Sequence, residues 1–138
     1  MAIETFAALE FFAGSGLVGT GLAPDFKVLW ANDNSAKKAK VFRANHPEVE
    51  FDPRAIQEVH GSELPSADLA WASFPCQDLS LAGNLSGMRK GTRSGLFWEW
   101  VRIVAELEQF GKRPTVLVAE NVAGFVVAHK GNQLFPSF

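Results

Sequence analysis

The sequence of 138 residues contains only one cysteine, Cys76. A single cysteine excludes an internal disulfide and any zinc cluster of the Cys-x-x-Cys type. The chain also lacks a low-complexity tract, the basic start of a signal peptide, and any apolar run long enough to span a membrane. These absences predict a globular cytoplasmic protein whose free thiol suits a reducing compartment.

Net positive charge is also missing, because 13 basic residues are set against 15 acidic ones and the formal net charge is −2. This balance argues against a surface built mainly to bind phosphate groups, although a local basic patch remains compatible with it. Hydrophobic residues make up 47% of the chain, and its length suffices for one domain with a real core. Composition therefore predicts one globular domain and leaves its ligand open.

What the chain does contain is an alternation of apolar, strand-like runs and helix-like patterns. Strands are expected over residues 9–12, 28–31, 49–51, 69–74 and 115–119, and helices over 17–22, 36–45 and 96–110. This alternation predicts an α/β fold with a mostly parallel sheet of about five strands and helices on both faces. In such sheets ligands bind beyond the carboxyl ends of the strands.

The pattern over residues 96–110 is the clearest amphipathic helix. Its apolar stripe, expected to pack on the sheet, consists of Leu96, Trp100, Ile103, Val104 and Leu107. The opposite side, expected to face solvent, carries Glu99, Arg102, Glu106 and Glu108. His46 and His60 are also expected on the surface.

A glycine motif follows the first expected strand. Gly14, Gly16 and Gly19 satisfy G-x-G-x-x-G, which gives a ligand room at a helix N-terminus, although a glycine-rich turn without a ligand fits equally well. Asp33 lies 19 residues after Gly14, at the end of the second strand, where a carboxylate could accept hydrogen bonds from ribose hydroxyls. A turn with Asn34 or Ser35 as helix cap also explains this segment, and both interpretations can hold together.

Two further candidates lie at later strand ends. Cys76 follows an apolar run that stops at Pro75, which is where a catalytic nucleophile would lie, although a lone cysteine is often an inert buried residue. Glu120 ends the next strand, and its carboxyl group could donate a proton while a thiolate adds to an electron-poor ring. These residues suit nucleophile-assisted alkylation of a pyrimidine, and their spacing fits a thiol-dependent oxidoreductase that uses NAD as well.

Three segments, in the order in which they occur along the chain, resemble the motifs of one known family and so bear on this choice. Glu10-Phe11-Phe12-Ala13-Gly14-Ser15-Gly16, then Phe74-Pro75-Cys76-Gln77 with Ser80, and then Glu120-Asn121-Val122 resemble the first, fourth and sixth motifs of the bacterial cytosine carbon-5 DNA methyltransferase family. Arg93-Ser94-Gly95-Leu96-Phe97 is similar to the family's segment between the last two motifs. The resemblance runs from about residue 9 to about residue 131.

The resemblance implies a Rossmann-like, S-adenosylmethionine-dependent methyltransferase fold and double-stranded DNA as substrate. Cys76 would attack carbon 6 of a flipped-out cytosine, Glu120 would hold the ring nitrogen, and carbon 5 would receive the methyl group, leaving S-adenosylhomocysteine. The residues implied to bind the cofactor are Phe12, Ala13, Gly14, Gly16, Leu17, Asp33, Asn34, Ile56, Pro75 and Leu96. Those implied to contact the base or DNA are Gln77, Ser80, Arg89, Lys90, Arg93, Asn121 and Val122, the three basic residues belonging to a loop that would close on DNA.

Two departures from the family pattern matter. Ala55 stands where the family's third motif usually has an acid that contacts the cofactor. Family enzymes also continue past the Glu120-Asn121-Val122 motif with more sheet and a target-recognition domain. We therefore expect residues 1–138 to form the N-terminal part of a catalytic domain, truncated after about five strands, which acts with a separate C-terminal subunit. The alternatives are a non-catalytic subunit or remnant, and an RNA cytosine carbon-5 methyltransferase.

Overall fold

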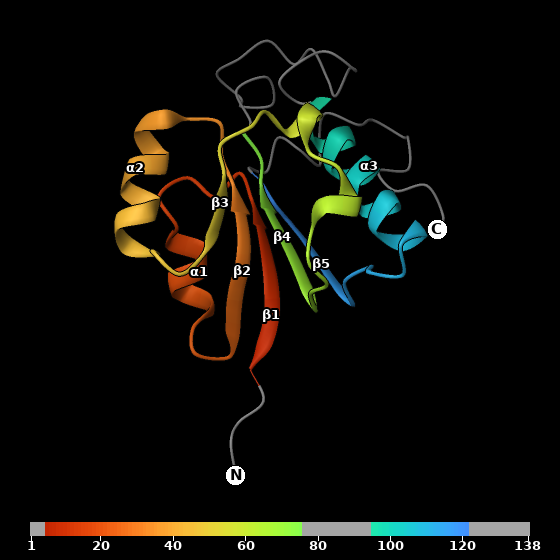
Figure 1. Ribbon diagram of the computed structural model, residues 1–138, viewed down its shortest axis with the longest axis horizontal. Helices are drawn as coiled ribbons and strands as arrows, with labels where there is room; N and C mark the ends of the chain where they lie inside the picture. The colour runs from red at the N-terminus through yellow and green to blue at the C-terminus, as the bar shows by residue number, and fades with distance from the viewer. Residues whose placement is uncertain (1–4, 76–94, 122–138) are drawn as a thin grey trace.

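The computed structural model describes residues 5–75 and 95–121 (Figure 1). Within these ranges the chain forms one five-stranded sheet in the order β3-β2-β1-β4-β5. The strands are β1 (Phe6–Phe11), β2 (Phe26–Asn32), β3 (Glu50–Asp52), β4 (Leu69–Ser73) and β5 (Val116–Glu120). Every neighbouring pair is parallel, which confirms the predicted sheet.

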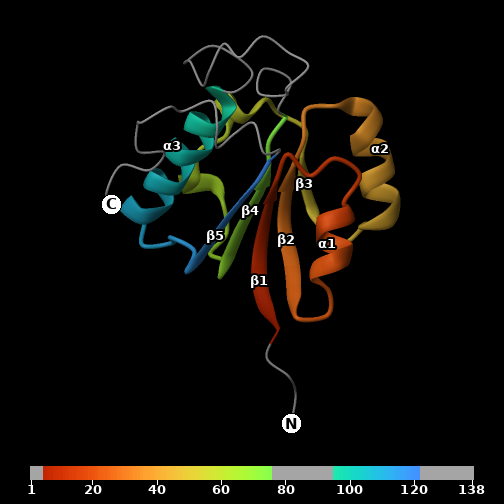
Figure 2. The same cartoon turned by 180° about the vertical axis from the view of Figure 1, so that it is seen from behind.

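Helices cover both faces of this sheet, as predicted, which is visible from the two sides in Figures 1 and 2. One face carries α1 (Leu17–Leu22) and α2 (Ala36–Asn45), and the other carries α3 (Leu96–Gln109). Two short 3-10 turns, η1 (Ile56–Glu58) and η2 (Gly61–Glu63), lie beside α3. No helix among the described residues is both long enough and apolar enough to cross a lipid bilayer.

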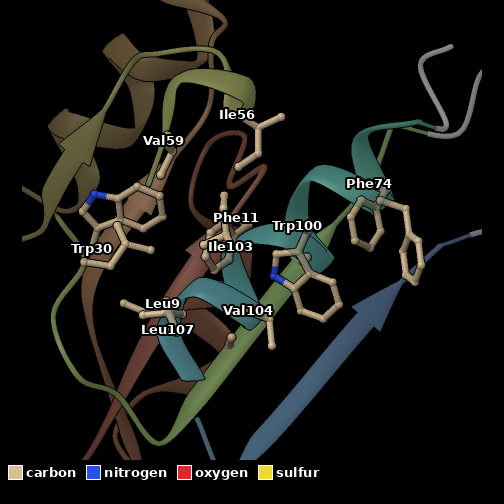
Figure 3. Close-up of a cluster of buried hydrophobic side chains, with 14 residues drawn as sticks. Leu9, Phe11, Trp30, Ile56, Val59, Phe74, Trp100, Ile103, Val104 and Leu107 are labelled. Atoms are coloured by element: carbon tan, nitrogen blue, oxygen red, sulfur yellow. The ribbon is translucent and has the colours of Figure 1, made fainter. Parts of the chain in front are cut away.

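The larger core lies between the sheet and α3 (Figure 3). Side chains alternate along β1, so Leu9 and Phe11 point into this core while Ala8 belongs to the cluster under α2. The Phe11 ring meets Trp30 at a centroid distance of 5.1 Å and Trp100 at 6.4 Å, both in edge-to-face orientation. The buried residues of α3 are Phe97, Trp100, Ile103, Val104 and Leu107, which confirms the predicted stripe except that Leu96 is only partly buried.

The other side of α3 is not simply solvated, contrary to expectation. Arg102 Nη2 donates hydrogen bonds to the carbonyl oxygens of Ile56 (3.2 Å) and Val59 (2.9 Å). Glu106 accepts a hydrogen bond from the Gly61 amide at 2.7 Å and pairs with Arg102 at 2.7 Å. These charged groups satisfy buried backbone groups and attach η1 and η2 to α3; Glu108 alone of the predicted set is well exposed.

Local signals explain where α2 begins and ends. Ser35 is its N-cap and accepts a hydrogen bond from the Lys38 amide at 3.4 Å, in agreement with the expected cap. The helix ends at Asn45, before His46 and Pro47.

The outer strands β3 and β5 carry few buried side chains, whereas the carboxyl end of β2 is fully buried.

Candidate active site

A pocket of about 340 Å³ opens at the carboxyl ends of the strands, the rim where the sequence predicted a site. Its volume lies within the range of about 300–1,000 Å³ that is usual for ligand pockets. The pocket draws on the ends of β1, β2 and β4, on the start of α2, on η1 and on the start of α3. The lining residues are Phe12, Asn32, Asp33, Asn34, Ser35, Lys38, Ile56, Gln57, Ser73, Phe74, Pro75 and Leu96.

Two phenylalanines supply an aromatic wall. The rings of Phe12 and Phe74 lie 5.2 Å apart between centroids, and Phe74 is fixed from behind by Phe97 at 5.4 Å and Trp100 at 5.6 Å. Phe12 is only partly buried and has a left-handed φ of 56°, so the chain turns sharply as β1 ends. A planar heterocycle can pack against such a wall.

Asp33, directly after β2, supplies the pocket with a buried carboxylate and is 8% exposed. Its Oδ2 accepts a hydrogen bond from the Gly14 amide at 2.9 Å, and its Oδ1 accepts one from the Ser35 amide at 2.9 Å. A carboxylate has about four acceptor positions, so about two remain for the hydroxyl groups of a ligand. Lys38 Nζ lies 3.9 Å from Oδ2 and adds one positive charge to the pocket.

The glycine turn, which we define as residues 13–16, lies next to the pocket but does not line it. The Ala13 amide donates to the carbonyl of Asn32 at 2.9 Å, which joins the turn to the end of β2. Gly14 and Gly16 both have left-handed φ values, 59° and 88°, which a larger residue would adopt only with strain. Leu17, the first residue of α1, is 78% exposed and does not line the pocket.

The wall formed by η1 is held by a polar network. The Asn32 side-chain amide donates to the carbonyls of Asp52 (3.0 Å) and Arg54 (2.8 Å). The Asp52 carboxylate pairs with Arg54 at 2.7 Å, and Arg54 also meets Glu63 at 2.9 Å. Burial acts to raise the pKa of Asp52, but hydrogen bonds from Arg54 outweigh it, so the pKa is lowered. Asp52 is therefore committed to Arg54.

Glu10 is a buried acid to which the sequence analysis gave no separate role. It is 1% exposed on β1, beneath α1, and no hydrogen bond of good geometry reaches either carboxyl oxygen among the described residues. Burial raises the pKa of Glu10 to about 7, and the Gly19 amide offsets this only in part. Its signal was present in the sequence, because one charged residue interrupts an otherwise apolar strand.

The predicted site residues divide into four groups. The pocket brings together Phe12, Asp33, Asn34, Ile56, Pro75 and Leu96, whereas Ala13, Gly14, Gly16 and Leu17 lie outside its lining. Glu120 is exposed at the end of β5 and is followed by Asn121. The residues that lie outside the described ranges are Cys76, Gln77, Ser80, Arg89, Lys90, Arg93 and Val122. All of these role assignments stay predictions.

Backbone register brings the segment that precedes Cys76 and the end of β5, which carries Glu120, to one part of the rim. Ser73 and Glu120 are register partners across β4 and β5. The Phe74 amide donates to the Glu120 carbonyl at 3.3 Å. The segment that leads into Cys76 therefore runs beside the carboxyl end of β5.

Several pocket residues were not predicted. Asn32 and Ser73 are the last residues of β2 and β4, so the strand-end rule could have found them. Phe74 belonged to the second of the three motifs but had no role of its own, and Lys38 enters the pocket from the first turn of α2. No sequence signal distinguishes Gln57, which enters the pocket because η1 follows β3.

Curated relatives of this chain include type II methyltransferases of bacteria. The chain is 32% identical over 125 residues to the type II methyltransferase M.NgoFVII of Neisseria gonorrhoeae, a match that covers 88% of this chain and 32% of the relative. It is 37% identical over 129 residues to the type II methyltransferase M2.BsuMI of Bacillus subtilis, covering 91% and 31%. The chain thus spans about a third of the length of these relatives.

Solved structures share the fold. A DNMT2 variant of Spodoptera frugiperda superposes with a TM-score of 0.63 at 23% identity, over 89% of this chain and 37% of that chain. The Dnmt2 methyltransferase of S. pombe gives 0.62 at 19% identity, over 87% and 37%. These likenesses confirm the predicted Rossmann-like methyltransferase fold.

A family described as C-5 cytosine-specific DNA methylase matches residues 6–136, nearly the whole chain. The cofactor predicted for this chain, S-adenosylmethionine, is the one that this family uses. The family predicted from the three motifs is confirmed, and the chain belongs to the C-5 cytosine-specific DNA methylase family.

Proposed function

We propose that this chain binds S-adenosylmethionine in the pocket at the strand ends and carries the catalytic residues for methylation of carbon 5 of cytosine in DNA. The observation that carries the proposal is the combination of an aromatic wall and a buried carboxylate in one pocket. It occurs at the carboxyl rim of a chain that belongs to this family. Residues 1–138 then form the N-terminal part of the catalytic domain, acting in the cytoplasm.

The residues present fit the cofactor. The Phe12 and Phe74 rings would pack against its adenine, and Asp33 would accept hydrogen bonds from its ribose hydroxyls through the acceptor positions that Gly14 and Ser35 leave open. Asn34, Ile56, Pro75 and Leu96 complete the enclosure. Ala13, Gly14, Gly16 and Leu17 would lie near its methionine end. When bound, S-adenosylmethionine supplies an electrophilic methyl group.

The reaction assigned to Cys76 and Glu120 is an addition followed by an elimination. The Cys76 thiolate forms a bond to carbon 6 of the cytosine while Glu120 protonates or hydrogen-bonds the ring nitrogen, so carbon 5 becomes nucleophilic. After methyl transfer, carbon 5 loses its proton and the bond to Cys76 breaks. The register of Ser73 with Glu120 supports a joint role for Cys76 and Glu120, because Cys76 follows Ser73 by three residues.

The remaining motif residues would serve the nucleic acid. Carbon 6 is inaccessible inside a duplex, so the cytosine must leave the helix before Cys76 can attack it. We assign contacts with the flipped base and the DNA backbone to Gln77, Ser80, Arg89, Lys90, Arg93, Asn121 and Val122. The three basic residues are suited to phosphate groups.

We also propose that turnover requires sequence equivalent to the other two thirds of the relatives. The chain covers only 32% and 31% of the two relatives named above. The exposed side of β5, where Val116 is 47% exposed, could receive it. A separate subunit that carries a target-recognition domain is the partner we expect.

Covalent trapping tests this mechanism. Duplex DNA that carries 5-fluorocytosine is mixed with S-adenosylmethionine and the chain. The reaction is run with the chain alone and with a second polypeptide, which is the part of the Bacillus subtilis relative that this chain does not match. Fluorine at carbon 5 replaces the proton that must be lost before the cysteine is released, so a cysteine that has reacted stays attached to the DNA. We expect a denaturation-resistant complex with the second polypeptide and none with Cys76→Ala.

The other outcomes separate the alternatives. A complex with the chain alone would show that no partner is needed. A complex on RNA but not DNA would indicate the RNA-directed activity. No complex under any condition, from a chain that still binds the cofactor, would indicate a non-catalytic subunit or remnant.

A further inference from the structure

The glycine turn is held from both ends of α2. Before the helix starts, the Asp33 carboxylate accepts the hydrogen bond of the Gly14 amide at 2.9 Å. After the helix ends, His46 reaches back to the other end of the same turn, where its Nε2 lies 2.9 Å from the carbonyl oxygen of Gly16. His46 is thus partly buried and engaged, contrary to the surface position expected from the sequence.

The hydrogen bond to Gly16 determines which ring nitrogen of His46 carries a hydrogen. The Gly16 carbonyl oxygen can only accept, so His46 Nε2 must carry the hydrogen. The same oxygen accepts from the Thr20 hydroxyl at 3.0 Å and from the Thr20 amide at 3.2 Å. Several donors therefore converge on the one carbonyl at which the glycine turn becomes α1.

The His46 ring is also packed tightly. A Cβ at Gly16 would lie 2.5 Å from His46 Cδ2 and 3.0 Å from Phe42 Cδ2, so the ring rests directly on the glycine. The ring contacts Phe42 at a centroid distance of 5.0 Å, and the His46 amide donates to the Phe42 carbonyl at 2.8 Å. A ring anchored in this way transmits the position of α2 to the turn.

We propose that His46 is a positioning residue, which holds the glycine turn in its cofactor-binding shape by donating from Nε2 to the Gly16 carbonyl. The importance of that shape for the cofactor rests on the proposed function. His46 does not line the pocket, so it acts through Gly16 and not by touching the ligand. The competing explanation is that the ring serves only as packing.

Two substitutions separate the donor from the ring. His46→Phe keeps an aromatic ring on Gly16 and Phe42 but has no donor, whereas His46→Gln keeps an N–H donor without the ring. His60→Phe is a control, because the His60 side chain is 59% exposed and lies beside Glu106 on the other face of the sheet. All variants are made in the full chain.

Amide hydrogen exchange of Gly14, Gly16 and Thr20 is the first measurement, with β1 amides as an internal reference for global unfolding. His46→Phe should speed exchange at the turn about three- to tenfold, the factor expected for one neutral hydrogen bond. His46→Gln should stay within about twofold of the wild type, as should His60→Phe. Unchanged exchange in His46→Phe would overturn the proposal, as would equal acceleration in both His46 variants.

Calorimetric titration with S-adenosylhomocysteine is the second measurement. The dissociation constant should rise about three- to tenfold in His46→Phe and stay near the wild-type value in His46→Gln. Wild-type affinity in His46→Phe would overturn the role in cofactor binding. If the wild type binds no S-adenosylhomocysteine, the proposed function fails, while hydrogen exchange still decides whether His46 holds the turn.

Discussion

The rim over β1, β2 and β3 and the rim at the end of β5 differ in how firmly they are built. On the first, Asn32, Asp33 and Asp52 are each at most 9% exposed, and hydrogen bonds or ion pairs hold all three. On the second, Ala119 and Glu120 are exposed. The contrast indicates that the described residues preorganise the side assigned to the cofactor, whereas Glu120 receives no comparable enclosure from them.

The largest expected effect comes from breaking the core under the first rim. Phe11→Ala removes a ring that is fully buried between Trp30 and Trp100, so we expect a loss of about 3–5 kcal/mol in the free energy of unfolding. Val116→Ala on β5 should cost only about 0.5 kcal/mol, because that side chain is 47% exposed. Urea unfolding measures both. Similar losses in the two variants would contradict the comparison.

The buried acid Glu10, which lies beneath α1, should make stability depend on pH. Burial raises the pKa of Glu10 to about 7 from an ordinary value of 4.5, so the folded protein holds this proton more tightly than the unfolded chain. The associated stability is fully present below pH 4.5 and is lost as pH rises through 7, a change of roughly 3 kcal/mol at most.

Glu10→Gln should therefore be more stable than the wild type at pH 8, by up to about 3 kcal/mol, and gain nothing at pH 4.5. Thermal unfolding at several pH values measures the difference. Glu48→Gln is the control, because Glu48 is exposed after α2. Parallel stability curves for Glu10→Gln and wild type would contradict the assignment.

A smaller effect is expected where α3 holds the wall of the pocket. Arg102→Lys keeps the charge but loses the planar fork that reaches Ile56 and Val59, so we expect a cost of about 1–2 kcal/mol. Arg113→Lys, at a surface pair with Glu108, should change stability by less than about 0.5 kcal/mol. Equal costs in chemical denaturation would mean that Arg102 contributes no more than a surface charge.

Sequence reasoning predicted elements whose signals are local. The bounds of α2 follow from Ser35 as cap and from the His46-Pro47 stop. Strands β1, β2, β4 and β5 follow from apolar runs bounded by glycine, proline and polar residues, whereas β3, with two acidic residues among its three, has no such run. The strand-end rule located the rim of the pocket. The three motifs identified the family.

What was missed depends on contacts between distant segments. Arg102 and Glu106 look solvated in a helical pattern, and only the path of η1 and η2 turns them into partners for buried carbonyl and amide groups. His46 likewise lies 30 residues from Gly16, and no periodicity links the two. Charged and polar residues at such positions default to the surface in any single-sequence analysis.

Binding of S-adenosylhomocysteine to the 138-residue chain tests the central claim most directly. Calorimetric titration should show one site, and Phe12→Ala should weaken it about tenfold or more, since stacking of a base on an aromatic ring is worth about 1–3 kcal/mol. Phe6→Ala is the matched control, because Phe6 is 50% exposed on β1 and lies outside the pocket. No binding by the wild type, or equal binding by Phe12→Ala, would contradict the assignment of this pocket to the cofactor.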